Sequence, residues 1–150
     1  MKNISELFLD TNILVHLTLT DFDAKKHREA SGVVSRLFAQ KVRLSISDQV
    51  LREFMAVVTN ARFLKKPLSS TEAVSQVNIF RDTFTVRESD GEALDVCLRL
   101  VAEHGVTGAL VHDAAIAATA IRHGVTHLMT YNTSDFKSFK DITSVVPGDL

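Results

Sequence analysis

An apolar run that ends in an aspartate lies near the start of the chain, where residues 7–14 read LFLDTNIL. The run before Asp10 is short and continuously apolar, which predicts a strand over residues 4–9 that is buried inside a sheet. Further strand-like segments at 43–47, 84–87, 127–131 and 143–146 are separated by segments of helical periodicity. Strands that alternate with helices predict an α/β fold with a central parallel sheet covered on both faces.

Several residues mark where the helices are expected to begin and end. Helical spacing of apolar residues covers 24–40, and a second apolar stripe runs through 50–58. The last helix is expected over 113–123. The boundary residues are Ser47 or Asp48 as a cap, Ser69 with Glu72 and Ser89 with Glu92 as capping boxes, and Gly105 and Gly124 as helix ends.

Length and composition set the broad class of protein. The 150 residues, of which 45% are hydrophobic, suit a single domain spanning 1–150. No stretch is apolar for long enough to span a membrane, and the start of the chain lacks a signal-peptide pattern. The single cysteine, Cys97, cannot form an internal disulfide, so a cytoplasmic location is expected, with Cys97 buried in a helix.

The formal net charge of −1 excludes a protein that coats nucleic acid nonspecifically. A local basic cluster could still attract a nucleic acid. Two such clusters are present, Lys25-Lys26-Arg28 and Arg62-Lys65-Lys66. The simpler interpretation of each cluster is a solvated helix end.

Four acidic residues are expected to meet at one edge of the sheet. Asp10 and Asp135 follow strand-like segments, Glu53 lies one turn into the helix after 43–47, and Asp113 opens the last helix. Parallel sheets bind ligands beyond the carboxyl ends of their strands. Each acid alone could be a helix cap, a turn residue or half of an ion pair. Without a shared site, however, four separate explanations of this kind would all have to be correct.

Carboxylates that cluster without basic partners indicate a divalent cation. Two like charges about 4 Å apart repel by roughly 4 kcal/mol at an effective dielectric near 20. Hard cations prefer oxygen ligands, which favours Mg²⁺ or Mn²⁺. The six histidines lack the spacing of a zinc site, and only His112 stands next to a candidate ligand. Phosphate-binding and dinucleotide glycine loops and a serine elbow are absent from the sequence, which leaves metal-dependent phosphate chemistry as the favoured hypothesis.

Four stretches together resemble the PIN-domain nucleases, and most of all the VapC-type toxins of toxin–antitoxin pairs. They read FLDTNIL at 8–14, LREF at 51–54, DAAIAATA at 113–120 and TYNTSDF at 130–136. The resemblance covers nearly the whole chain in the family's order and implies a PIN-like α/β/α sandwich. It also implies Mg²⁺- or Mn²⁺-dependent cleavage of RNA, a homodimer, and a cognate antitoxin protein that masks the active site.

All four acids match the family's acidic positions. The resemblance therefore implies that Asp10, Glu53, Asp113 and Asp135 are the catalytic and metal-binding residues. They would hold one or two ions against the scissile phosphate. Asp135 is expected either to bind the ion or to orient the attacking water.

Four polar residues beside the acids are expected to hold the carboxylates in place. Thr11 or Asn12 could hydrogen-bond Asp10, and Thr130 and Asn132 could do the same near Asp135. Such groups matter because the orientation of a ligand affects its affinity for the metal. Ordinary turn chemistry explains these residues equally well.

Three other functions remain open. A haloacid-dehalogenase-type phosphatase needs a second aspartate two residues after the first, where this chain has Asn12. A receiver module needs a pair of acids at the first strand end and a lysine near a later one, but no lysine follows Met129 until Lys137. A non-catalytic interaction protein could use the same acids to bind a basic partner, and metal-dependent cleavage would distinguish it.

Overall fold

The computed structural model describes residues 3–150 and contains a five-stranded sheet in which every neighbouring pair is parallel. The strands are β1 (Glu6–Leu9), β2 (Arg43–Ser47), β3 (Thr85–Arg87), β4 (His127–Met129) and β5 (Thr143–Val145), in the order β3-β2-β1-β4-β5. The helices are α1 (Thr11–Thr18), α2 (Ala24–Ala39), α3 (Asp48–Val58), α4 (Ser70–Thr83), α5 (Gly91–His104) and α6 (Leu110–Arg122), with short 3-10 turns η1 (Thr133–Phe136) and η2 (Pro147–Asp149). The expected α/β fold with a central parallel sheet is confirmed.

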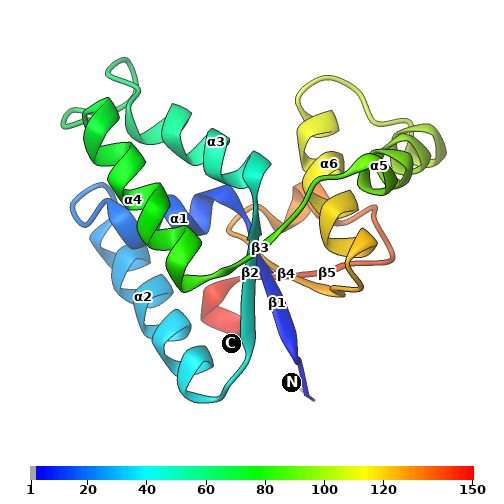
Figure 1. Ribbon diagram of the computed structural model, residues 1–150, viewed down its shortest axis with the longest axis horizontal. Coiled ribbons are helices and arrows are strands. Elements are labelled where there is room, and N and C mark those ends of the chain that lie inside the picture. Colours follow the sequence, from blue (N-terminus) through cyan, green and yellow to red (C-terminus); the bar gives the residue numbers. More distant parts are fainter. Residues whose placement is uncertain (1–2) are drawn as a thin grey trace.

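The helices form two layers on opposite faces of the sheet (Figure 1). Helices α1 to α4 lie on one face, where they connect β1 to β2 and β2 to β3. Helices α5 and α6 lie on the other face and carry the chain from β3 back across the sheet to β4. Because parallel crossovers are right-handed, a reversal of direction along the sheet moves the connecting helices to the opposite face.

This reversal creates a topological switch point between β1 and β4. Leu9 pairs with Met129, and the Asp10 amide donates a hydrogen bond of 3.0 Å to the Met129 carbonyl, so the pairing extends one residue past β1. Open parallel sheets bind ligands outside the carboxyl ends of their strands at such a point. The fold therefore places Asp10 where a ligand is expected.

The core explains why the first strand reads as a continuous apolar run. Leu7, Phe8 and Leu9 have no exposed surface, because β1 is the central strand and helices cover both of its faces. Cys97 is buried on α5 as predicted, and burial raises the pKa of its thiol. Within residues 3–150, no helix is both long and apolar enough to cross a membrane.

Most of the predicted helix boundaries are confirmed. Ser47 caps α3 by accepting a hydrogen bond of 3.3 Å from the amide of Val50. Ser69 and Glu72 form the reciprocal capping box at the start of α4. Gly105 ends α5 in the left-handed conformation, at a φ of 60° that an L side chain rarely adopts.

The capping box predicted at Ser89 and Glu92 is wrong. Asp90 caps α5 instead, and its carboxylate accepts a hydrogen bond of 2.9 Å from the amide of Ala93. The Ser89 hydroxyl points to another element and lies 3.0 Å from the hydroxyl of Thr119 on α6. The tertiary contact with Thr119 thus engages the Ser89 side chain that the local sequence pattern assigns to the helix cap.

Three elements around the acids also differ from the predictions. Helix α1 begins directly after Asp10, although the sequence patterns predict no helix there. Helix α6 begins at Leu110, so Asp113 lies in its first turn and does not open the helix. Strand β4 ends at Met129, two residues earlier than predicted, and Thr130 turns its side chain into the site.

Candidate active site

Asp10 lies at the centre of the site and is held by three neighbouring residues. Its side chain caps α1 by accepting a hydrogen bond of 2.8 Å from the Thr11 amide. The Thr130 hydroxyl donates to the other carboxylate oxygen at 2.7 Å, and the Asn12 amide donates to that same oxygen at 3.2 Å. Asp10 is only 5% exposed, so these contacts fix a carboxylate that has little access to water.

Asn12 connects the ends of β1 and β4. Its side-chain amide also donates to the Thr130 hydroxyl at 3.0 Å, and its side-chain oxygen accepts from the Tyr131 amide at 3.0 Å. The Asn132 amide donates to the Thr130 hydroxyl at 3.0 Å, so Asn132 contributes its backbone to this network. Asn12 and Thr130 thus both bond Asp10, although the sequence predicts Thr130 near Asp135, and within residues 3–150 Asn132 bonds Thr130 and no carboxylate.

Glu53 reaches the site from the middle of α3. The Thr11 hydroxyl donates to one of its oxygens at 2.9 Å, and the Gln49 side chain donates to the other at 3.0 Å. Gln49 also donates to the backbone carbonyl of His112 on α6, at 3.0 Å. Gln49 thus links the two helices on either side of the site. Sequence reasoning missed this residue, although its position one turn before Glu53 could have indicated it.

Asp113 and Asp135 complete the group from the other side. Asp113 projects from the first turn of α6, and Asp135 lies in η1, which follows β4. Both side chains are partly buried, and neither makes an ion pair within residues 3–150. His112, the histidine next to Asp113, is exposed, and it is the backbone carbonyl of this residue that takes part in the network.

The electrostatics show that the four carboxylates lie close enough to affect one another. Burial raises the pKa of Asp10, and the charges of Glu53 and Asp135 raise it further, against the hydrogen bonds from Thr130 and Thr11. Burial and the charges of Asp10, Asp135 and Glu53 raise the pKa of Asp113 to about 6.

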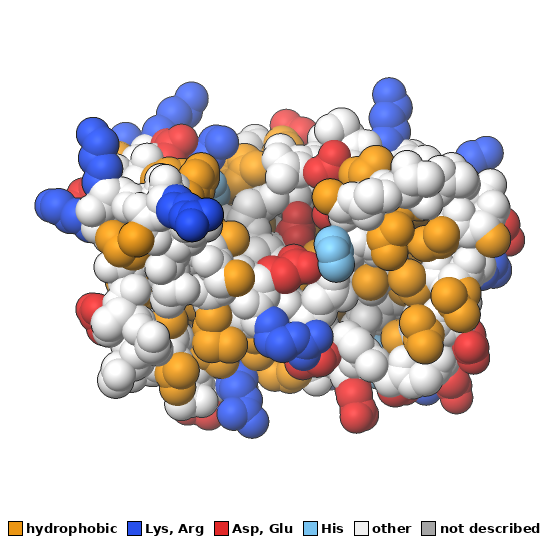
Figure 2. Space-filling view, turned by 90° about the horizontal axis from the view of Figure 1, so that it is seen from above, with side chains coloured by type: hydrophobic (Ala, Val, Ile, Leu, Met, Phe, Trp, Pro, Cys, Tyr) orange, Lys and Arg blue, Asp and Glu red, His pale blue; other side chains and the backbone are white. Residues whose placement is uncertain are grey.

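Seen from above the carboxyl edge of the sheet, acidic side chains gather in a hollow between the two lobes of the molecule (Figure 2). The donors facing this hollow are carboxylate oxygens, which suit Mg²⁺ or Mn²⁺. Within residues 3–150, no three acidic, histidine or cysteine side chains converge closely enough to coordinate an ion by themselves. An open set of carboxylates suits Mg²⁺, which keeps several waters and uses few protein ligands.

The sequence profile of the PIN domain family matches residues 7–142, which include all four acids. The chain belongs to the PIN domain family. Its PIN-domain relatives include the VapC ribonuclease Mb2897 of Mycobacterium bovis and the ribonuclease VapC43 of Mycobacterium tuberculosis. Each is 30% identical to this chain over 124 residues, which are 81% of this chain and 83% of the relative. The resemblance to VapC-type PIN domains is therefore confirmed over most of the chain.

Solved structures share this PIN fold. The VapBC2 complex of Rickettsia felis bound to a promoter DNA fragment contains a chain that is 21% identical, with a TM-score of 0.67 and coverage of 94% of this chain and 98% of that one. VapC20 of Mycobacterium tuberculosis, described as a sarcin-ricin loop cleaving toxin, is 18% identical, with a TM-score of 0.66 and coverage of 89% and 95%. At these identities the likeness shows the fold, and it extends over nearly the full length of each chain.

Proposed function

We propose that this PIN-domain chain is a divalent-metal-dependent endoribonuclease and the toxin of a toxin–antitoxin pair. Relatives named as VapC ribonucleases, at 30% identity over four fifths of the chain, support the reaction class. Solved VapBC complexes with the same fold support a small antitoxin as the partner. A cytoplasmic location belongs to the same proposal, since the substrate is cellular RNA.

The observation that most supports a metal-dependent reaction is the unbalanced negative charge at the switch point. Four carboxylates face one hollow, and no lysine or arginine within residues 3–150 forms an ion pair with any of them. Asp10, Glu53 and Asp113 would hold Mg²⁺ or Mn²⁺ directly or through bound waters, and Asp135 would bind the ion or orient the attacking water. When bound, the ion lowers the pKa of a coordinated water and stabilises negative charge on the leaving oxygen.

The neighbouring polar residues would make this reaction efficient by fixing the ligands. The Thr130 hydroxyl and the Asn12 amide restrict the Asp10 carboxylate to one orientation. Thr11 and Gln49 do the same for Glu53, one on each carboxylate oxygen. Ligands that are already oriented lose little conformational freedom when an ion and a phosphate bind.

The direct test is to incubate the purified protein with total cellular RNA in Mn²⁺ or in chelator, and to map the cut ends. Discrete RNA cleavage in Mn²⁺ that disappears in chelator is the expected result. Intact RNA under both conditions, with protein that is folded by circular dichroism, would contradict the nuclease assignment. The cut ends would also identify the RNA and the sequence at which it is cleaved.

The same preparation separates the nuclease from a phosphatase of the haloacid-dehalogenase type. That phosphatase needs a second aspartate at position 12, where Asn12 instead donates hydrogen bonds to Asp10 and Thr130. Hydrolysis of a generic phosphate monoester, with no RNA cleavage, would favour the phosphatase. We expect no hydrolysis of the monoester.

Self-association is a further part of the proposed function. Exposed apolar side chains gather on the lobe formed by α5 and α6 (Figure 2), among them Leu94 and Leu98 on α5 and Leu110 on α6, with exposed fractions of 58%, 59% and 43%. A homodimer would bury such a surface. Analytical ultracentrifugation should report a dimer, and Leu94→Glu with Leu98→Glu should shift it to the monomer.

A further inference from the structure

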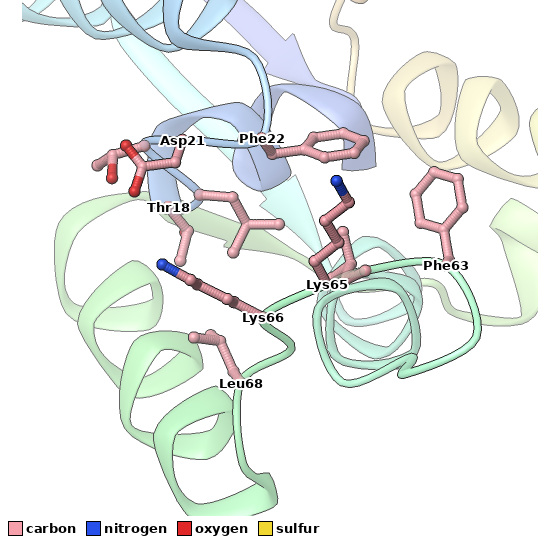
Figure 3. Close-up of a pocket in the computed structure, with 10 residues that line it drawn as sticks. Thr18, Asp21, Phe22, Phe63, Lys65, Lys66 and Leu68 are labelled. Atoms are coloured by element: carbon pink, nitrogen blue, oxygen red, sulfur yellow. The ribbon is translucent and has the colours of Figure 1, made fainter.

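A second hollow lies at the opposite end of α1 from Asp10, and none of the four acids lines it. Its volume is about 560 Å³. Its wall combines the end of α1 and the loop that follows it with the loop between α3 and α4 (Figure 3). Thus two loops far apart in the sequence form one concave surface.

Two exposed phenylalanines dominate this surface. Phe22 is 45% exposed and Phe63 is 61% exposed, although phenylalanine is usually buried. Their ring centroids are 5.5 Å apart with an angle of 61° between the planes, an edge-to-face pair. Each ring therefore keeps apolar surface in contact with solvent, and another flat group can pack against that exposed surface.

Basic side chains flank the two rings. Lys65 and Lys66 line the hollow, and Figure 3 shows the Lys65 ammonium directed toward the rings of Phe22 and Phe63. Lys66 extends toward the side of Thr18 and Asp21, the one acidic residue of the lining. The cluster Arg62-Lys65-Lys66, for which the simpler sequence interpretation is a solvated helix end, thus brings a cation to an exposed aromatic pair.

A row of aromatic contacts connects this hollow to the acidic site. Phe22 stacks on His16 at 5.8 Å between centroids, and His16 packs edge-on against Tyr131 at 5.2 Å. The Tyr131 amide donates to Asn12, which in turn donates to Asp10. The Lys26 ammonium lies 4.9 Å from the centre of the Tyr131 ring, so the Lys25-Lys26-Arg28 cluster contributes a cation midway along the row.

The spacing suits a short segment of nucleic acid. Asp10 precedes α1 and Thr18 ends it, and eight helical residues extend about 12 Å. Three or four stacked nucleotides span that distance at about 3.4 Å each, and fewer do so when the strand is extended. A strand whose scissile phosphate lies at the acids would therefore bring a base a few nucleotides further along the strand to the phenylalanines.

We propose that Phe22 and Phe63 form a base-stacking platform for single-stranded RNA, and that Lys65 binds a phosphate of the same segment. Exposed aromatic rings that alternate with cations are the usual composition of a single-strand binding groove. The positive charge of Lys65 and Lys26 complements a phosphate backbone leading to the acids. This inference rests on the proposed ribonuclease function. It adds a second binding site for the RNA substrate, a few nucleotides away from the scissile bond.

The test measures RNA binding in chelator, where the proposed cleavage does not occur. A short single-stranded RNA with a fluorescein label reports the Kd by anisotropy, and a 2-aminopurine base in the same RNA reports stacking by its loss of fluorescence. Phe63→Ala should weaken binding by roughly 5- to 150-fold and restore 2-aminopurine fluorescence. Phe63→Trp should retain both properties, since it keeps an aromatic face.

Phe38 provides a matched control for the ring. It is 41% exposed, but it lies at the other end of α2 and stacks on Phe84, away from the hollow. Phe38→Ala should leave the Kd for RNA unchanged. Because Phe63 is well exposed, its replacement is not expected to unfold the protein.

The proposed phosphate contact of Lys65 is tested separately, by the salt dependence of RNA binding. Lys65→Ala should reduce the slope of log Kd against log salt by about 0.7, the value for one phosphate contact with a single strand. Lys140→Ala, at an exposed lysine outside the hollow, should leave the slope unchanged. An unchanged slope in Lys65→Ala would overturn the phosphate contact.

Two outcomes would overturn the platform itself. One is a Phe63→Ala variant that binds RNA like the wild type, with 2-aminopurine still quenched. The other is a Phe63→Ala variant that loses the antitoxin but keeps RNA, which would assign the hollow to the protein partner. Binding that depends on Phe63, with no RNA cleavage in Mn²⁺, would uphold the platform and remove the nuclease function, so the two failures are distinguishable.

Discussion

Glu6 and Asp10, the acids at the two ends of β1, have opposite electrostatic environments. Arg87 donates two hydrogen bonds to Glu6, at 2.9 and 2.7 Å, and Arg43 lies 3.8 Å away. Burial alone would raise the pKa of Glu6, but the hydrogen bonds from Arg87 and Ser45 and the two arginine charges outweigh burial and lower it. Asp10 is more deeply buried, receives only neutral donors and has a raised pKa.

The difference separates a structural acid from one that is prepared for a ligand. A carboxylate that the chain neutralises itself contributes to stability and offers little to an added cation. A carboxylate that is oriented by neutral donors and surrounded by other acids keeps its negative charge available, at some cost to the stability of the metal-free protein. Changes at the two ends of β1 should therefore affect different measurements.

The largest effect is expected from Asp10→Asn. Even partners that only orient a metal ligand typically contribute 10- to 100-fold, so loss of a ligand should lower metal-dependent RNA cleavage by more than roughly 100-fold. The melting temperature in chelator should stay the same or rise, because one of four like charges is removed. Undiminished cleavage by this variant would refute the role assigned to Asp10.

Thr130→Val should have the next largest effect. It removes the hydroxyl that donates to Asp10 at 2.7 Å and keeps nearly the same shape, so cleavage or Mn²⁺ affinity should fall by roughly 10- to 100-fold. Thr119→Val is the matched control, since Thr119 is equally buried but bonds Ser89 and the Ala115 carbonyl outside the site. Equal losses of activity in both variants would indicate a packing effect and contradict the orienting role.

Glu6→Gln should lower the stability of the protein and leave RNA cleavage unchanged, which is the converse of Asp10→Asn. The change weakens the paired hydrogen bonds to Arg87 and should cost about 1–2 kcal/mol of stability, a fall in Tm of roughly 2–8 °C. RNA cleavage at a temperature below the transition should be unchanged. Glu103→Gln, which removes an exposed carboxylate 3.3 Å from Arg99, should change the Tm little. A loss of cleavage in Glu6→Gln would break the distinction between the two ends of the strand.

The smallest effect concerns pH and Asp113. Its pKa of about 6 in the folded protein exceeds the ordinary value of 3.8, so folding favours the protonated form. The resulting stabilisation is full below about pH 4 and is lost as the pH rises through about 6. In chelator, the Tm of the wild type relative to Asp113→Asn should therefore fall between pH 4 and pH 7. Excess Mn²⁺ should reverse this trend, because the ion competes with the proton.

The sequence predicted the parts of the fold that depend on local pattern. Continuous apolar runs gave the strands, and Ser47, Ser69 and Gly105 gave helix boundaries that the structure confirms. Local pattern was misleading where a tertiary contact competes. The Ser89 hydroxyl bonds Thr119 instead of capping α5, and Thr130 leaves the strand register to bond Asp10.

The sequence by itself determined that this chain has a parallel α/β fold and four acids in the order of a PIN domain. Apolar periodicity depends on neighbouring residues, and the order of the motifs can be followed directly along the chain. The family match over 7–142 agrees with both. Only the tertiary structure decided that Thr130 bonds Asp10 and that Thr11 bonds Glu53, and that Phe22, Phe63 and Lys65 share one hollow. These contacts join segments far apart in the chain, and no local pattern encodes which loops the sheet and its crossovers bring together.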